Sequence, residues 1–141
     1  MTMPEKLDSP AAPLVRRHLV VCVDDDPVVL SALKRLLRSE PYEFIITESP
    51  EEALELVRTR DVSLLIADYR MPDMSGTGLL QLVKSWSPET VRLLLTGHPD
   101  AAWVLQAEER QLMHLVCGKP WDNKELRETI LLQLRAREAQ K

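Results

Sequence analysis

Short, mainly apolar runs recur along the chain and define its organisation. They cover residues 19–23, 44–47, 62–67, 91–95 and 112–117. Apolar runs of this length, with at most one polar residue in each, are typical of strands buried on both faces of a sheet. The pattern therefore predicts five buried strands.

The segments between these runs carry apolar residues three and four positions apart, which is the spacing of one helix face. Five helices are expected: between Pro27 and Pro41, after Ser49, around residues 79–83, over residues 101–109 (a weaker pattern), and after Asp122. Ser49 and Asp122 have side chains that accept hydrogen bonds from a first helical turn, and Pro27 suits the first position of a helix.

Strands and helices thus alternate along the chain. This alternation predicts an α/β fold in which a doubly wound, five-stranded parallel sheet is covered by helices on both faces. The length of 141 residues suits one domain. We expect a flexible N-terminal tail over residues 1–17, because this stretch is polar and contains three prolines, and a tail or linker start at residues 139–141.

The composition excludes several classes of protein. The formal net charge is −4, whereas nucleic-acid-binding domains are normally basic. Two cysteines, Cys22 and Cys117, are too few for a disulfide scaffold and have no zinc-site spacing. No apolar run approaches the length of a membrane span, and the N-terminus lacks the apolar stretch of a secretory signal, so a cytoplasmic location is expected.

Polar residues that could take part in binding or catalysis follow four of the five predicted strands. Residues 24–26 are three consecutive aspartates, and Asp68, Thr96 and Lys119 follow later strands. The carboxyl ends of parallel strands meet at one edge of a sheet, where ligands bind in such folds. Clustered carboxylates repel unless a cation compensates, and hard oxygen ligands suit Mg²⁺. A carboxylate nucleophile, a metal, an ammonium and a hydroxyl together suggest phosphoryl transfer.

Four segments in a fixed order resemble the receiver domain of two-component response regulators. They are residues 23–27 (VDDDP), 68–76 (DYRMPDMSG), 95–97 (LTG) and 119–121 (KPW). The resemblance covers residues 18–138, taken here as the receiver domain. It implies a flavodoxin-like fold with strand order 2-1-3-4-5. The Lys-Pro-Trp segment is similar to receivers that precede HD-GYP phosphodiesterase domains.

The resemblance also implies a metal site. By this analogy, Asp25 and Asp68 bind Mg²⁺ directly, together with the backbone carbonyl of Arg70. Asp24 contributes mainly through metal-bound water. Asp26 is interpreted as a helix-capping acid rather than a main ligand.

The remaining roles concern the phosphoryl group. Asp68 would accept it from the histidine of a sensor kinase or phosphotransfer protein, Lys119 would contact it, and Thr96 would be the switch hydroxyl. The chain would then be no enzyme on external substrates, but would catalyse its own phosphorylation and slow autodephosphorylation. A downstream effector, or a homodimer through the helix at 101–109, the strand at 112–117 and the last helix, is the expected readout.

One position departs from the family. Val116 stands where receivers usually carry an aromatic residue that turns inward with the switch hydroxyl. His98, two residues after Thr96, could tune the access of water to the phosphate. Trp86, Trp103 and Trp121 are interpreted as packing or partner-facing residues.

Two alternatives stay open. A phosphorylation-independent receiver that acts only as a binding module is favoured by Val116 and disfavoured by the intact acidic residues. An aspartyl-nucleophile phosphohydrolase is disfavoured because Arg70 stands where such enzymes place an acid/base aspartate.

Overall fold

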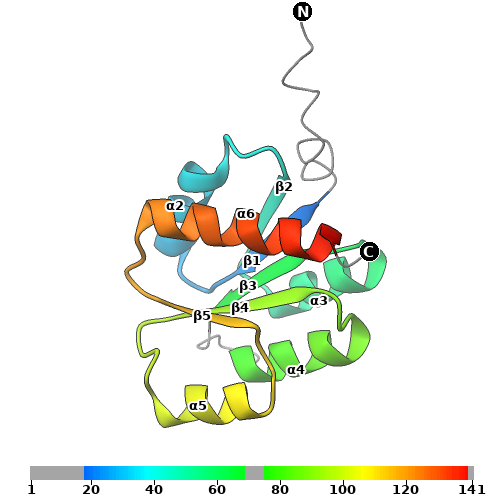
Figure 1. Cartoon of the computed structure of the whole chain (residues 1–141), viewed down its shortest axis with the longest axis vertical. Helices are drawn as coiled ribbons and strands as arrows, with labels where there is room; N and C mark the ends of the chain where they lie inside the picture. The colour runs from blue at the N-terminus through cyan, green and yellow to red at the C-terminus, as the bar shows by residue number, and fades with distance from the viewer. Residues whose placement is uncertain (1–17, 69–74, 140–141) are drawn as a thin grey trace, which may run out of the picture.

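Five parallel strands form the centre of the protein (Figure 1). The computed structural model describes residues 18–68 and 75–139. The elements are β1 (Leu19–Val23), α2 (Pro27–Leu37), β2 (Glu43–Thr47), α3 (Pro50–Thr59), β3 (Leu64–Asp68), α4 (Gly76–Trp86), β4 (Val91–Thr96), α5 (Ala102–Glu109), β5 (Leu115–Gly118) and α6 (Asn123–Ala139). The strand order is β2-β1-β3-β4-β5, which confirms the predicted doubly wound α/β sheet with five helices.

Side chains on each strand alternate between two separate cores, because successive residues of a strand point to opposite faces. On one face, Val21 and Leu65 pack with residues of α3, α4 and α5. On the other, Cys22 and Ile66 pack with residues of α2 and α6. Figure 1 shows the same two helix layers on either side of the sheet. Burial on both faces explains why the central strands are mainly apolar.

Capping side chains fix where the helices begin. Ser49 Oγ accepts the Glu52 N–H at 3.1 Å, and Asp122 Oδ1 accepts the Glu125 N–H at 2.9 Å, as the sequence predicts. Asp26 caps α2 by accepting the Val28 N–H at 2.9 Å, which agrees with its interpretation as a capping acid. In contrast, Ala101 precedes α5 and offers no side-chain cap. The weak helical pattern of this segment corresponds to a weakly capped helix.

The predicted start of the last strand was wrong by three residues. Strand β5 begins at Leu115, and Leu112 and Met113 are buried before it. Gln111 has a φ of 58°, and the buried guanidinium of Arg92 donates from Nε to the carbonyl of Leu112 at 2.8 Å. That carbonyl therefore bonds to a side chain, so this apolar stretch forms a packed turn.

Two further findings concern excluded features. Cys22 and Cys117 are free thiols on β1 and β5, which β3 and β4 separate. Of the helices within residues 18–68 and 75–139, none combines the length and apolar character that crossing a bilayer requires.

Helix α6 provides a direct test of the core on the α2–α6 face. Ile130 is fully buried there, whereas Leu132, two residues later, is 65% exposed. Ile130→Ala should lower the unfolding free energy by about 2–5 kcal/mol. Leu132→Ala is the control and should change it by about 0.5 kcal/mol or less. Denaturant unfolding measures both, and equal losses would contradict this packing.

Candidate functional site

The carboxyl edge of the sheet gathers the polar residues singled out in the sequence. Asp24 follows β1, Asp68 ends β3, Thr96 ends β4 and Lys119 follows β5. These side chains line one hollow of about 320 Å³, together with Asp25. Parallel topology brings the four strand ends together although the residues lie up to 95 positions apart in sequence.

Lys119 is the centre of this arrangement. Its Nζ donates to Asp24 Oδ2 at 2.9 Å and to Asp68 Oδ1 at 2.8 Å. Its backbone N–H donates to the Thr96 carbonyl at 2.8 Å, which ties the chain after β5 to the end of β4. Burial by itself would lower the pKa of Lys119, but the hydrogen bonds to Asp68 and Asp24 outweigh it and the pKa is raised. The ammonium therefore stays charged between two carboxylates.

Asp24 is a buried acid, with 1% of its surface exposed. Burial raises its pKa, and the nearby Asp68 charge adds to this, while the hydrogen bonds from Lys119 and from the Asp26 N–H oppose it. Asp25, next in the chain, is exposed. The two neighbouring aspartates thus differ: one is fixed and desolvated, and the other is open to solvent.

The donor set fits a divalent cation. Asp24, Asp25 and Asp68 each offer a carboxylate oxygen, and these atoms lie within 4.8 Å of one another. Hard oxygen donors at this spacing match the preference of Mg²⁺. The fourth predicted ligand, the carbonyl of Arg70, lies outside the described residues.

The loop after β4 completes the wall of the hollow. Thr96 is buried, and its Oγ1 accepts the His98 N–H at 3.1 Å. Gly97, His98 and Trp103 also line the hollow. The sequence assigned Trp103 to packing or partners; it does pack against the core, but it also borders the site. Helix α5 begins at the carboxyl edge of the sheet, so its first turn lies beside the hollow. The position of Trp103 shortly after Thr96 in the sequence could have indicated this placement.

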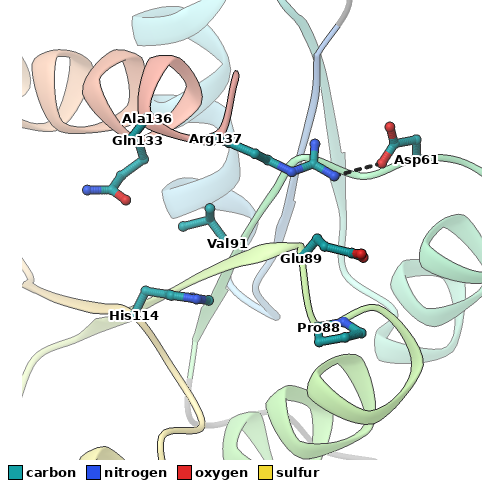
Figure 2. A pocket seen from close by; sticks show the side chains of 8 residues that line it. All are labelled: Asp61, Pro88, Glu89, Val91, His114, Gln133, Ala136 and Arg137. Atoms are coloured by element: carbon teal, nitrogen blue, oxygen red, sulfur yellow. Dashed lines mark hydrogen bonds and ion pairs between the residues drawn. The ribbon is translucent and has the colours of Figure 1, made fainter. Parts of the chain in front are cut away.

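A larger hollow lies at the opposite, amino edge of the sheet (Figure 2). Its residues come from the loops before β3, β4 and β5, from the first residue of β4 and from the last turns of α6: Asp61, Pro88, Glu89, Val91, His114, Gln133, Ala136 and Arg137. Arg137 is paired with Asp61 at 2.9 Å. Among the predicted site residues that the structure describes, none lines it, so size alone does not identify the functional site.

Arg137 belongs to a buried polar cluster that the sequence did not reveal. Its Nη1 donates to Ser63 Oγ at 2.7 Å, and Ser63 also hydrogen-bonds to His18. His18 Nε2 lies 2.9 Å from Glu138 Oε2. His18 and Ser63 are almost fully buried, so this cluster fastens the end of α6 to the starts of β1 and β3.

The comparisons with known proteins identify the family. The profile of the response regulator receiver domain matches residues 20–131. This chain belongs to the response regulator receiver domain family. Receiver domains are signalling modules of two-component systems, and they typically bind Mg²⁺ in an acidic pocket, which corresponds here to the aspartate cluster.

Solved receiver structures are similar throughout the domain. The signal receiver domain of an HD domain-containing protein from Pseudomonas fluorescens Pf-5 is 32% identical, with a TM-score of 0.82, covering 89% of this chain and 92% of that one. A CheY-like receiver domain protein from Methanospirillum hungatei JF-1 is 26% identical, with a TM-score of 0.82, covering 89% and 99%.

A curated relative is much longer than this receiver. The hydrogenase transcriptional regulatory protein HoxA of Cupriavidus necator is 29% identical over 115 residues, which are 82% of this chain and 24% of that protein. The chain therefore spans about a quarter of the length of this regulator.

The buried charge of Asp24 predicts a pH dependence of stability. Because its pKa is raised on folding from 3.8, the folded state binds the proton more tightly than the unfolded chain. Its contribution to the unfolding free energy therefore falls as pH rises from about 3.8 through the folded-state pKa. Asp24→Asn should remove this loss and raise the melting temperature at pH 7.

The matched control is Asp26→Asn, which keeps an exposed helix cap because asparagine caps as well as aspartate. Thermal unfolding from pH 4 to 8 compares the variants. A lower melting temperature for Asp24→Asn than for the parent at pH 7 would contradict the account of Asp24.

The carboxylate cluster also predicts stabilisation by Mg²⁺. Binding to the folded state alone adds about 2.7 kcal/mol when Mg²⁺ is a hundred times its Kd. Asp25→Asn removes an exposed ligand without opening a cavity and should shift the titration to higher Mg²⁺. Melting curves at constant ionic strength measure this. An identical Mg²⁺ response in the parent and in Asp25→Asn would argue against the site.

Proposed function

We propose that this receiver domain is a phosphorylation-dependent switch in a two-component phosphorelay, with Asp68 as the phosphoacceptor. The observation that carries the proposal is the contact of Lys119 Nζ with both Asp68 and Asp24 inside a hollow that also contains Thr96. A carboxylate held beside a fixed cation and a hydroxyl is suited to receive a phosphoryl group. The donor would be the phosphohistidine of a sensor kinase or phosphotransfer protein.

The transfer is a single displacement at phosphorus. A carboxylate oxygen of Asp68 attacks, the new P–O bond forms as the P–N bond to the donor histidine breaks, and the released imidazole nitrogen takes up a proton. Lys119 Nζ lies close enough to Asp68 to donate a hydrogen bond to an oxygen of the transferred phosphoryl group. When bound, Mg²⁺ supplies further positive charge to the phosphoryl oxygens.

The chain's own residues define where that ion would be held. Asp25 and Asp68 would bind it directly with the Arg70 carbonyl, as the family resemblance implies, and Asp24 would act through metal-bound water. The burial of Asp24 and its bond to Lys119 support this difference between Asp24 and Asp25.

The readout would begin at Thr96. Its Oγ1 holds the His98 N–H, so a Thr96 hydroxyl that turns to a phosphoryl oxygen would release this bond and free the loop before α5. The surface formed by α5, β5 and α6 would then present a changed face to an effector or to a second copy. Similarity to a receiver from an HD domain-containing protein supports an HD-type effector as one such partner.

The same proposal describes how the signal ends. Water attacks the phosphorus, the acyl phosphate P–O bond breaks, and phosphate leaves the regenerated Asp68 carboxylate. We propose slow autodephosphorylation of this kind in the cytoplasm, without turnover of an external substrate. The net charge of −4 supports protein partners rather than direct contact with nucleic acid.

A binding-only receiver is the second candidate, because Val116 is half-buried on β5 where an aromatic residue is usual. The aspartyl phosphohydrolase is weaker, because its acid/base position is occupied by Arg70. A binding-only receiver would leave Asp68 unmodified, whereas a phosphohydrolase would pass phosphate through Asp68 in repeated turnovers.

Acetyl phosphate tests the proposal without knowledge of the kinase. Intact mass should show the gain of one phosphoryl group with Mg²⁺ and none without it. Asp68→Asn should abolish the gain, while Asp61→Asn, an exposed acid at the opposite edge, should retain it. Modification that persists in Asp68→Asn would identify another acceptor and overturn the proposal; sustained phosphate release with multiple turnovers would favour the hydrolase.

A further inference from the structure

A small side chain, Val116, occupies the position on β5 where receivers usually carry an aromatic residue. Val116 packs beside the core on the α3–α5 face and is half-buried, so a small side chain stands on the edge strand nearest the site. Leu94 of β4 is its register partner and is fully buried in the same core. A valine has a single short branched side chain, so it cannot swing between an inward and an outward position as a large ring does.

A large aromatic side chain reaches the site from a different element. Trp103, in the first turn of α5, lines the hollow that contains Asp68, Thr96 and Lys119. Its ring also packs against the same core as Val116. Trp103 therefore contacts both the phosphoacceptor hollow and the core on the α3–α5 face.

Helix α5 is held to the protein by few groups. It has eight residues, its fully buried residues are Val104 and Ala107, and Ala101 provides no side-chain cap. Short, uncapped helices with little buried apolar surface open at low free-energy cost. A displacement of Trp103 would therefore move the helix that carries it.

We propose that Trp103 is the positioning residue that transmits the occupancy of the acidic hollow to α5, in place of the aromatic residue absent at position 116. The proposal rests on the proposed function, because a phosphoryl group on Asp68 is the occupant. A hollow of about 320 Å³ that gains a phosphoryl group loses free volume and gains negative charge. The ring on its wall would then repack, and α5 would follow because only two of its residues are buried and no side chain caps its first turn.

Fluorescence separates Trp103 from the other two tryptophans. Trp86 is 51% exposed at the end of α4, and Trp121 packs on the opposite face and donates from Nε1 to Asn123 at 2.9 Å. The Trp86→Phe/Trp121→Phe protein keeps Trp103 alone, and Trp86→Phe/Trp103→Phe keeps Trp121 alone. Each is titrated with Mg²⁺ and then treated with acetyl phosphate, while intact mass records phosphorylation in the same samples.

The Trp103-only protein should show a saturable change in emission and in quenching by acrylamide, and the Trp121-only protein should show a much smaller one. An unchanged Trp103 emission in fully phosphorylated protein overturns the proposal. If intact mass shows no phosphorylation, that result counts against the proposed function and not against the role of Trp103. The response of Trp103 emission to Mg²⁺ then tests whether Trp103 senses the occupancy of the hollow. Absence of any response to Mg²⁺ as well overturns the proposal.

A second experiment tests transmission rather than proximity. Amide hydrogen exchange in α5 should change several-fold on phosphorylation of the parent. Trp103→Ala should lose this difference, Trp103→Phe should retain part of it, and Leu105→Ala, an exposed position of the same helix, should retain all of it. A purely structural role would shift α5 exchange equally in both states. A phosphorylation-linked difference that survives intact in Trp103→Ala overturns the proposal.

Discussion

The bridge from Lys119 Nζ to Asp24 and Asp68 is the interaction on which the site depends. Three carboxylates gathered at one sheet edge repel each other, and burial of Asp24 adds to the cost. The ammonium offsets that repulsion from a residue that follows the edge strand β5. It therefore also helps to fix β5 at the edge of the sheet, together with the bond from the Lys119 N–H to the Thr96 carbonyl. A phosphoryl group that attracts Lys119 would change both the charge balance among the carboxylates and the attachment of β5.

The two edges of the sheet divide stability from chemistry. At the amino edge, His18, Ser63 and Arg137 form a buried polar cluster that fastens α6, and Arg92 fixes the turn before β5. At the carboxyl edge, the exposed loop after β4 and the weakly capped α5 surround the acidic hollow. The rigid edge holds the strand register, and the looser edge is free to respond. In the proposed switch, a change in charge would therefore move one loop and one helix while the sheet stays unchanged.

Sequence patterns predicted the features that depend on local periodicity and on short motifs, namely the strands, the helices and their caps. Strand β1 was predicted with its observed bounds, and the capping roles of Ser49, Asp122 and Asp26 were found as expected. The start of β5 was missed because the guanidinium of Arg92, a residue distant in sequence, takes up the Leu112 carbonyl. The His18–Ser63–Arg137 cluster was missed for the same reason, because it consists of contacts between elements, which periodicity does not encode. Trp103 was interpreted only as a packing or partner-facing residue, although its place in the first turn of the helix after β4 could have indicated that it borders the site.

Chemical trapping of the phosphoryl group identifies its acceptor most directly. Borohydride reduces an acyl phosphate to an alcohol, so phosphorylated aspartate becomes homoserine, which peptide mass mapping can locate. After treatment with acetyl phosphate and Mg²⁺, we expect homoserine at position 68 and unmodified aspartate at positions 24 and 25. Homoserine at either of those positions, or its absence from position 68 in protein that has gained a phosphoryl group, would contradict the account.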